Sequence, residues 1–223
     1  MSVGRRSGWR GQLRALRSTA LLVHVPTLVF LLILFVQTRY SLDNLMRDPL
    51  STMKAPFHTG VISNLGVLVW FSSAPVCLFS AVVVRKTGGD VVRTRFFLSA
   101  GLLTAMLAAD DLFMLHESAG WRLQIPELAI YAGYALLICA FLVSFRPYIL
   151  QTDYVLLLIA LGFFGTQVIV DPPEFQARYS EKVGRILEDG GKLLGIVTWT
   201  VYFMRTCTGE LTRALVPGER AQA

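Results

Sequence analysis

Four ionisable residues lie at the end of an apolar stretch in the middle of the chain: Asp110, Asp111, His116 and Glu117 come after the run 96–109. A charge near the centre of a lipid bilayer costs roughly 2.5–3.5 kcal/mol on insertion scales, so such residues normally face a protein interior or a cavity and serve a function. An uninterrupted helix would place Asp110 and Glu117 two turns apart on one face, with His116 at its margin. We therefore expect a carboxylate pair and an imidazole to share one site.

A second charged motif, Glu188-Asp189-Gly-Gly-Lys192, lies in the last apolar region of the chain. Glu188 precedes Lys192 by four residues, which is the favourable order for an ion pair along a helix. Glycines around this motif would let a neighbouring helix approach closely. We expect Lys192 to contact the first acidic cluster, at Asp110 or Glu117, and to bring both motifs into one site.

Three kinds of chemistry fit these residues. Asp110, His116, Glu117 and Glu188 offer oxygen and imidazole ligands to a divalent metal such as zinc, iron or manganese, which would activate water. Alternatively, a carboxylate whose pKa is raised by burial and by neighbouring acids would act as an acid–base group without a metal. In the third alternative, Lys192 neutralises a buried acid and only joins two helices.

The composition predicts the elements that would position these residues. Hydrophobic residues make up 54% of the 223 residues and charged residues 16%, and the mean hydropathy is +0.55, which is typical of an all-α, polytopic membrane protein. We predict a basic amphipathic segment at 1–17, a transmembrane domain at 18–205 and a short tail at 206–223. The six predicted spans are 18–37, 61–84, 96–117, 127–145, 154–170 and 183–204.

The distribution of arginine and lysine predicts the orientation. With six spans, thirteen of these residues would lie on the side of both termini and seven on the other side, when Arg185 is counted at the rim of the last span. Because basic residues are enriched on the cytoplasmic side, we expect both termini in the cytoplasm, an inner-membrane location and a site that opens toward the outer face. The net charge of +6 is then explained by lipid contact at the membrane surface, and nucleic acid is not an expected partner.

The function that these observations favour is a membrane hydrolase acting on a lipid-type substrate. Asp110, His116, Glu117 and Glu188 would be ligands or acid–base groups, and Lys192 would orient the substrate or stabilise an anion. A small transporter or proton-coupled protein using the same groups is the first alternative, and a structural or assembly protein with a buried ion-pair network is the second. Whether the protein is an enzyme therefore stays open at the level of the sequence.

Two short resemblances accompany these motifs. Glu188-Asp189-x-x-Lys192 resembles the Glu-Glu-x-x-Lys motif of the PrsW-type intramembrane proteases, but it lies in the last predicted span and no histidine motif follows it. The seven-span ceramidases and adiponectin-receptor-like hydrolases also pair Asp and His near a membrane face, but their His-x-x-x-His element is missing here. Neither resemblance assigns the chain to a family.

Overall fold

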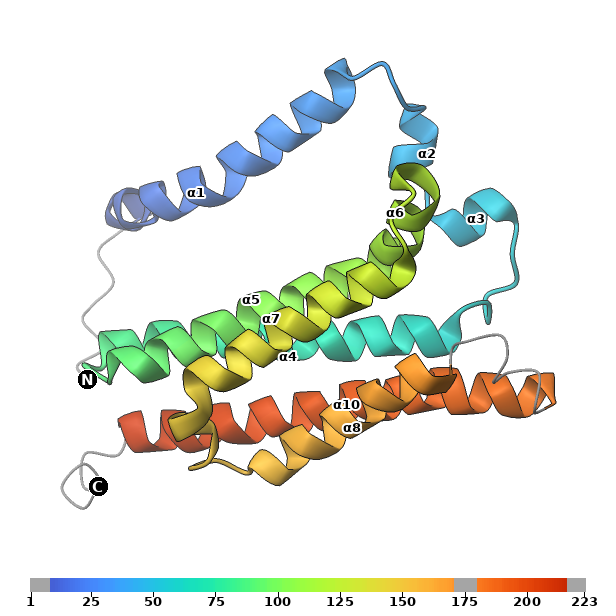
Figure 1. Ribbon diagram of the computed structural model, residues 1–223. Coiled ribbons are helices and arrows are strands. Elements are labelled where there is room, and N and C mark those ends of the chain that lie inside the picture. Colours follow the sequence, from blue (N-terminus) through green and yellow to red (C-terminus); the bar gives the residue numbers. More distant parts are fainter. Residues whose placement is uncertain (1–8, 171–179, 216–223) are drawn as a thin grey trace. The chain divides into compact units, whose positions relative to one another are not determined.

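The structure is a computed structural model, and it describes residues 9–170 and 180–215 (Figure 1). Every regular element in these two ranges is a helix, which confirms the predicted all-α class for the described residues. The chain divides into two compact units, residues 1–59 and residues 60–223, and each unit is described by itself.

The described part of the first unit contains α1 (Trp9–Val36), α2 (Leu42–Met46) and α3 (Pro49–Met53). α1 is continuous, so the described part of the predicted basic segment and the first predicted span belong to one helix. Large apolar side chains between Leu21 and Val36 are exposed in the structure. Such a surface suits contact with lipid better than contact with water.

The second unit contains the helices that carry both charged motifs. They are α4 (Val61–Lys86), α5 (Val91–Phe113), α6 (Leu115–Leu123), α7 (Glu127–Ile149), α8 (Tyr154–Val170) and α10 (Glu181–Leu215). α4 packs against both α5 and α10, while α8 packs against α10 and α7 against α5 (Figure 1). α4 is thus the central helix of this unit.

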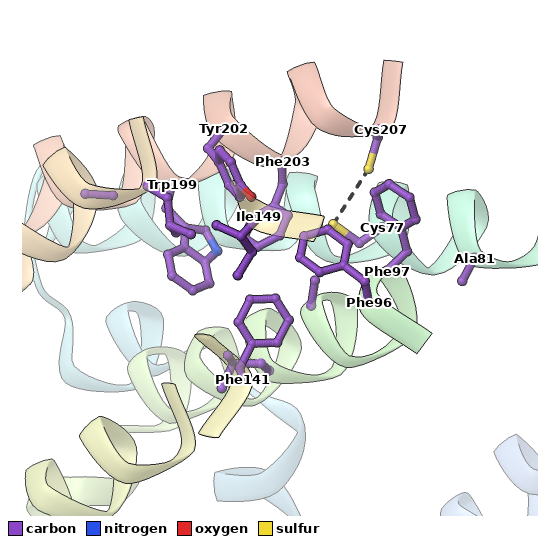
Figure 2. Packing of buried hydrophobic residues seen from close by; sticks show 14 of the residues in the cluster. Cys77, Ala81, Phe96, Phe97, Phe141, Ile149, Trp199, Tyr202, Phe203 and Cys207 are labelled. Atoms are coloured by element: carbon purple, nitrogen blue, oxygen red, sulfur yellow. Dashed lines mark hydrogen bonds between the residues drawn. The ribbon is translucent and has the colours of Figure 1, made fainter. Parts of the chain in front are cut away.

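The core of the second unit is largely aromatic. The ring centre of Phe96, on α5, lies 5.3 Å from that of Phe141 on α7 and 6.1 Å from that of Phe203 on α10 (Figure 2). Two buried thiols lie beside these rings: the sulfur atoms of Cys77, on α4, and Cys207, on α10, are 3.9 Å apart. Helix association inside a bilayer depends on such close packing, because burial from water contributes little there.

Two glycines allow the closest approaches between these helices. A Cβ atom at Gly101 of α5 would lie 2.7 Å from the side chain of Leu78 on α4, and one at Gly195 of α10 would lie 2.6 Å from the ring of Phe164 on α8. Any larger residue at these positions would push the helices apart. The glycine-lined side of α10 therefore meets α8 at Gly195, whereas a Cβ atom at Gly184 would meet no other described helix within 4 Å.

Three helices among the described residues are long and apolar enough to cross a membrane: Val61–Lys86, Val91–Phe113 and Leu128–Ile149. The apolar stretches Leu21–Val36 and Tyr154–Thr166 are shorter. Three of the six predicted spans are therefore supported by length and composition, and the other three stay predictions.

The last helix is longer than its predicted span. α10 continues to Leu215, eleven residues beyond the predicted end at 204. The predicted span ends at 204, just before the charged Arg205, but Arg205 is exposed within α10 and pairs with Asp153 at 2.6 Å. No proline follows until Pro217, so nothing in the sequence forces the helix to stop earlier.

Candidate functional site

α5 ends at Phe113, three residues before His116, at a break that the sequence analysis did not predict. Met114 adopts a left-handed conformation, with φ 48° and ψ 47°, and its backbone N–H donates to the carbonyl of Asp110. The chain then starts α6 in a new direction. The predicted span 96–117 is therefore not one helix, and the predicted shared face of Asp110 and Glu117 is wrong because helical spacing does not extend across the break.

The break brings His116 back onto Asp110. The buried carboxylate of Asp110 accepts hydrogen bonds from the backbone N–H of His116 at 3.0 Å and from its Nδ1 atom at 2.7 Å. It accepts a third from the hydroxyl group of Tyr134, on α7, at 2.6 Å. Three donors on one carboxylate hold the imidazole ring in a fixed orientation.

Tyr134 is a residue that the sequence analysis missed. It lies in the apolar, nearly charge-free helix α7, three residues after Tyr131, whose ring centre is 5.8 Å from that of His116. Two tyrosines one helical turn apart point to the same side of a helix. The spacing of Tyr131 and Tyr134, in the next predicted span after the acidic cluster, was the signal from which Tyr134 could have been found.

His116 has the arrangement of an acid–base group. Because an ionised carboxylate only accepts hydrogen bonds, Nδ1 is the donor to Asp110, and Nε2 carries the lone pair in the neutral imidazole. The hydrogen bond with Asp110 raises the pKa of His116 above its usual value, while burial acts in the opposite direction. The ring is thus oriented by one nitrogen and can exchange a proton through the other.

Glu117 lies at the edge of this group. Its Oε1 atom is 3.9 Å from Nε2 of His116, and 49% of its side chain is exposed. At that distance it makes no direct hydrogen bond with the ring, although one water molecule could bridge the two. Glu117 is therefore next to the imidazole but does not join the carboxylate of Asp110.

The neighbouring carboxylate, that of Asp111, points about 100° away around the axis of α5. Asp111 forms an ion pair with Lys192 of α10, which establishes the expected contact between the third and sixth predicted spans. The expected acid partner was Asp110 or Glu117, and it is Asp111 in the structure. The two motifs are thus connected through α5, with the imidazole on one side of the helix and the lysine on the other.

A metal centre built from the predicted ligands finds no support in the described residues. Within residues 9–170 and 180–215, no three His, Cys, Asp or Glu side chains come close enough together to hold a metal ion. Asp110 and His116 are in contact, whereas Glu188 lies partly buried on α10, one turn before Lys192. The predicted set of Asp110, His116, Glu117 and Glu188 is not assembled as a group.

A second ion pair, also missed from the sequence, lies near the other end of α5. Arg93 donates to Glu210 of α10 at 2.8 Å, and the hydroxyl group of Tyr148 on α7 donates to the same carboxylate at 3.3 Å. Glu210 is buried, although the prediction placed it in the short tail at 206–223. Its burial follows from the continuation of α10 beyond Arg205.

Three polar contacts therefore tie α5 to α10 along their lengths. Arg93 bonds Glu210 at one end, the indole of Trp199 donates to the hydroxyl of Thr104 at 3.0 Å in the middle, and Asp111 pairs with Lys192 at the other end. Eighteen residues separate the two ion pairs on each helix. At a rise of 1.5 Å per residue, this spacing is about 27 Å.

The comparisons with known proteins identify a family. The chain belongs to the family of the domain of unknown function DUF8692, which matches residues 19–206. The matched range contains Asp110, Asp111, His116, Tyr134 and Lys192, and it ends before Glu210. No curated protein and no solved structure matches the chain.

Proposed function

We propose that the protein is a multi-pass membrane enzyme that hydrolyses a lipid-type substrate, with His116 as the general acid–base. The observation that supports this proposal is the carboxylate of Asp110, which binds both Nδ1 and the backbone N–H of His116. A carboxylate that orients an imidazole through Nδ1 is the arrangement by which many hydrolases prepare Nε2 for proton transfer. Asp110 and Tyr134 are then positioning residues, and His116 is the catalytic residue.

The proposed reaction is the attack of water on an acyl ester or amide bond. Nε2 of His116 removes a proton from water as the oxygen attacks the carbonyl carbon, and the imidazolium ion then donates that proton to the leaving group. The negative charge of Asp110 stabilises the imidazolium ion, which is consistent with the raised pKa of His116. Glu117, 3.9 Å from Nε2, is placed to bind the same water molecule. No step is assigned to Glu188 or Lys192.

The spacing of the two ion pairs supports a membrane-spanning arrangement of α5 and α10. The layer between them, about 27 Å thick, is close to the hydrocarbon core of a bilayer, which measures about 30 Å. Side chains of this layer are mostly apolar and include Phe96, Phe97, Trp199 and Phe203. We infer that Asp111 and Lys192 mark one boundary and Arg93 and Glu210 the other, and that His116 lies at a membrane surface.

The full proposal keeps six spans, an inner-membrane location and both termini in the cytoplasm. It is supported by the thirteen-to-seven distribution of basic residues. In this orientation the cluster of Asp110, His116 and Tyr134 lies at the outer face. A lipid would reach His116 there with its scissile bond at the level of the head groups, where water is also available.

The test is hydrolysis of a p-nitrophenyl ester of a medium-chain fatty acid by the full chain purified in detergent. We expect the wild-type protein to hydrolyse the ester and His116→Gln to lower the rate by roughly 10²- to 10⁴-fold, because the general base is lost. His58→Gln is the matched control, since His58 lies in the other unit of the chain. An inactive wild-type protein, or equal rates for the two variants, would contradict the proposal.

A further inference from the structure

A small cavity lies on the side of α5 that faces away from His116. It is bounded by α4 and α10 and has a volume of about 40 Å³. The polar side chains that line it are Ser63 on α4, Asp111 on α5, and Asp189 and Lys192 on α10, and Gly66 contributes backbone from α4. Asp110 contributes nothing to this lining, so the cavity is separate from the proposed catalytic group.

One oxygen atom of Asp111 is left without a partner at this cavity. The side chain is only 8% exposed, and Oδ1 pairs with Lys192. Oδ2 is buried and has no hydrogen-bond partner among the residues that the structure describes. It points toward Gly66, since a Cβ atom placed on that glycine would be 3.9 Å away. Buried carboxylate oxygens in folded proteins are normally satisfied, so this atom needs a partner, which a water molecule or a cation in the cavity would supply.

The charges around the cavity favour a cation over an anion, although Asp189 is exposed to solvent. Asp111 and Asp189 carry one negative charge each and Lys192 carries one positive charge, so the lining has a net charge of −1. A single monovalent cation would neutralise it, whereas a divalent ion would reverse the charge next to an ammonium group. Near the hydrocarbon region of a membrane, a net charge is costly, so a cavity and ion whose charges sum to zero are favoured.

The volume of the cavity and its donor atoms limit which species can bind there. About 40 Å³ has room for a few water molecules or a small ion, but not for a lipid head group, a sugar or an amino acid. The donors are carboxylate and hydroxyl oxygens, which are hard ligands and suit hard cations rather than soft metals. We propose that this cavity binds one small monovalent cation of the size of Na⁺, held by Oδ2 of Asp111 with Ser63 and Asp189.

The experiment is a measurement of ²²Na⁺ binding by equilibrium dialysis, combined with thermal unfolding of the full chain in detergent. NaCl, KCl and choline chloride are compared at the same ionic strength. We expect one saturable site per chain and an unfolding midpoint that rises with Na⁺ more than with K⁺ or choline, because a ligand that binds only the folded state stabilises it.

Gly66→Ala is the decisive variant. Its added methyl group would lie 3.9 Å from Oδ2 of Asp111, in the space assigned to the ion, and 3.1 Å from the flexible end of Ile196. The ion pair with Lys192 stays intact, so the variant avoids the unpaired charge that Asp111→Asn would leave. We expect it to weaken ²²Na⁺ binding at least tenfold and to abolish the Na⁺-specific rise of the midpoint.

Gly133→Ala is the matched control, since it adds the same methyl group to a helix with no other atom within 4 Å. It should bind ²²Na⁺ as the wild-type protein does. Equal stabilisation by Na⁺ and choline, absence of saturable binding, or unchanged binding in Gly66→Ala would each overturn the proposal and leave the cavity to water. Because the test measures no hydrolysis, its outcome is independent of the proposed enzyme activity.

Discussion

Two adjacent carboxylates in this protein have different partners because neighbouring residues on a helix point about 100° apart. Asp110 faces α6 and α7 and receives three hydrogen bonds from His116 and Tyr134. Asp111 faces α4 and α10 and pairs with Lys192. One dipeptide thus holds the imidazole of His116 from one carboxylate and forms an ion pair with Lys192 from the other.

The energetic role of the ion pair can be separated from catalysis by substitution. Lys192→Met leaves the buried carboxylate of Asp111 without its counter-ion, and we expect a loss of roughly 3 kcal/mol in the free energy of unfolding. This is the low end of the roughly 3–5 kcal/mol range for broken buried pairs, because Lys192 is 41% exposed. The combined replacement of Asp111 by Asn and Lys192 by Met should recover much of that loss. Reversible unfolding in mixed detergent micelles measures the free energy of unfolding of the single and the double variant.

Arg205→Met is the control for this prediction. It breaks the ion pair with Asp153, whose two side chains are 61% and 51% exposed, and should change the free energy of unfolding by less than about 1 kcal/mol. Equal effects of Lys192→Met and Arg205→Met would show that the pair with Asp111 does not stabilise the bundle.

At the scale of the helices, the break between α5 and α6 creates the site. The backbone of Met114 has φ 48°. Residues other than glycine adopt this left-handed conformation at a cost of roughly 1–2 kcal/mol. We expect Met114→Gly to keep the break and to raise the free energy of unfolding by about 1 kcal/mol. Leu112→Gly, an exposed position two residues earlier inside α5, should lower it by about 1 kcal/mol.

The same two substitutions also distinguish the break from a continuous helix. If residues 96–117 formed one helix, glycine would be destabilising at both positions, and the two variants would lose stability alike. Thermal midpoints of the two proteins in the same detergent decide between these outcomes.

The sequence predicts the helices better than it predicts their ends. Hydropathy alone places predicted spans at 61–84 and 154–170, where α4 and α8 are found. The break at Met114 could not be predicted, because glycine or asparagine normally marks a left-handed helix end and methionine does not. The burial of Glu210 was missed for a related reason: the predicted span ends at 204, whereas α10 continues to Leu215.

The contacts within the site were also only partly predictable from the sequence. The spacing of Asp110, His116 and Glu117 indicated a polar site, and the surplus of acids indicated a partner for Lys192. Which acid pairs with which base depends on the direction of α6 and the register of α5 against α10. Both are set by packing of residues far apart in the sequence, so spacing along one helix could not provide them.

At the scale of the whole molecule, the proposed orientation makes a direct prediction. A reporter that is active only in the cytoplasm should be active when fused after Leu215 and silent when inserted in the loop 38–60. The expected pattern follows from the excess of basic residues on the side of the termini. The reverse pattern would place Asp110 and His116 at the cytoplasmic face.

The proposal that Asp110 makes His116 the acid–base group of a membrane hydrolase predicts a specific pH dependence of ester hydrolysis. A general base works only when deprotonated, so the rate should fall as the pH decreases through the pKa of His116. Since the hydrogen bond with Asp110 raises that pKa, Asp110→Asn should lower the rate and move this fall to lower pH. An unchanged pH profile in Asp110→Asn, with an unchanged rate, would contradict the account.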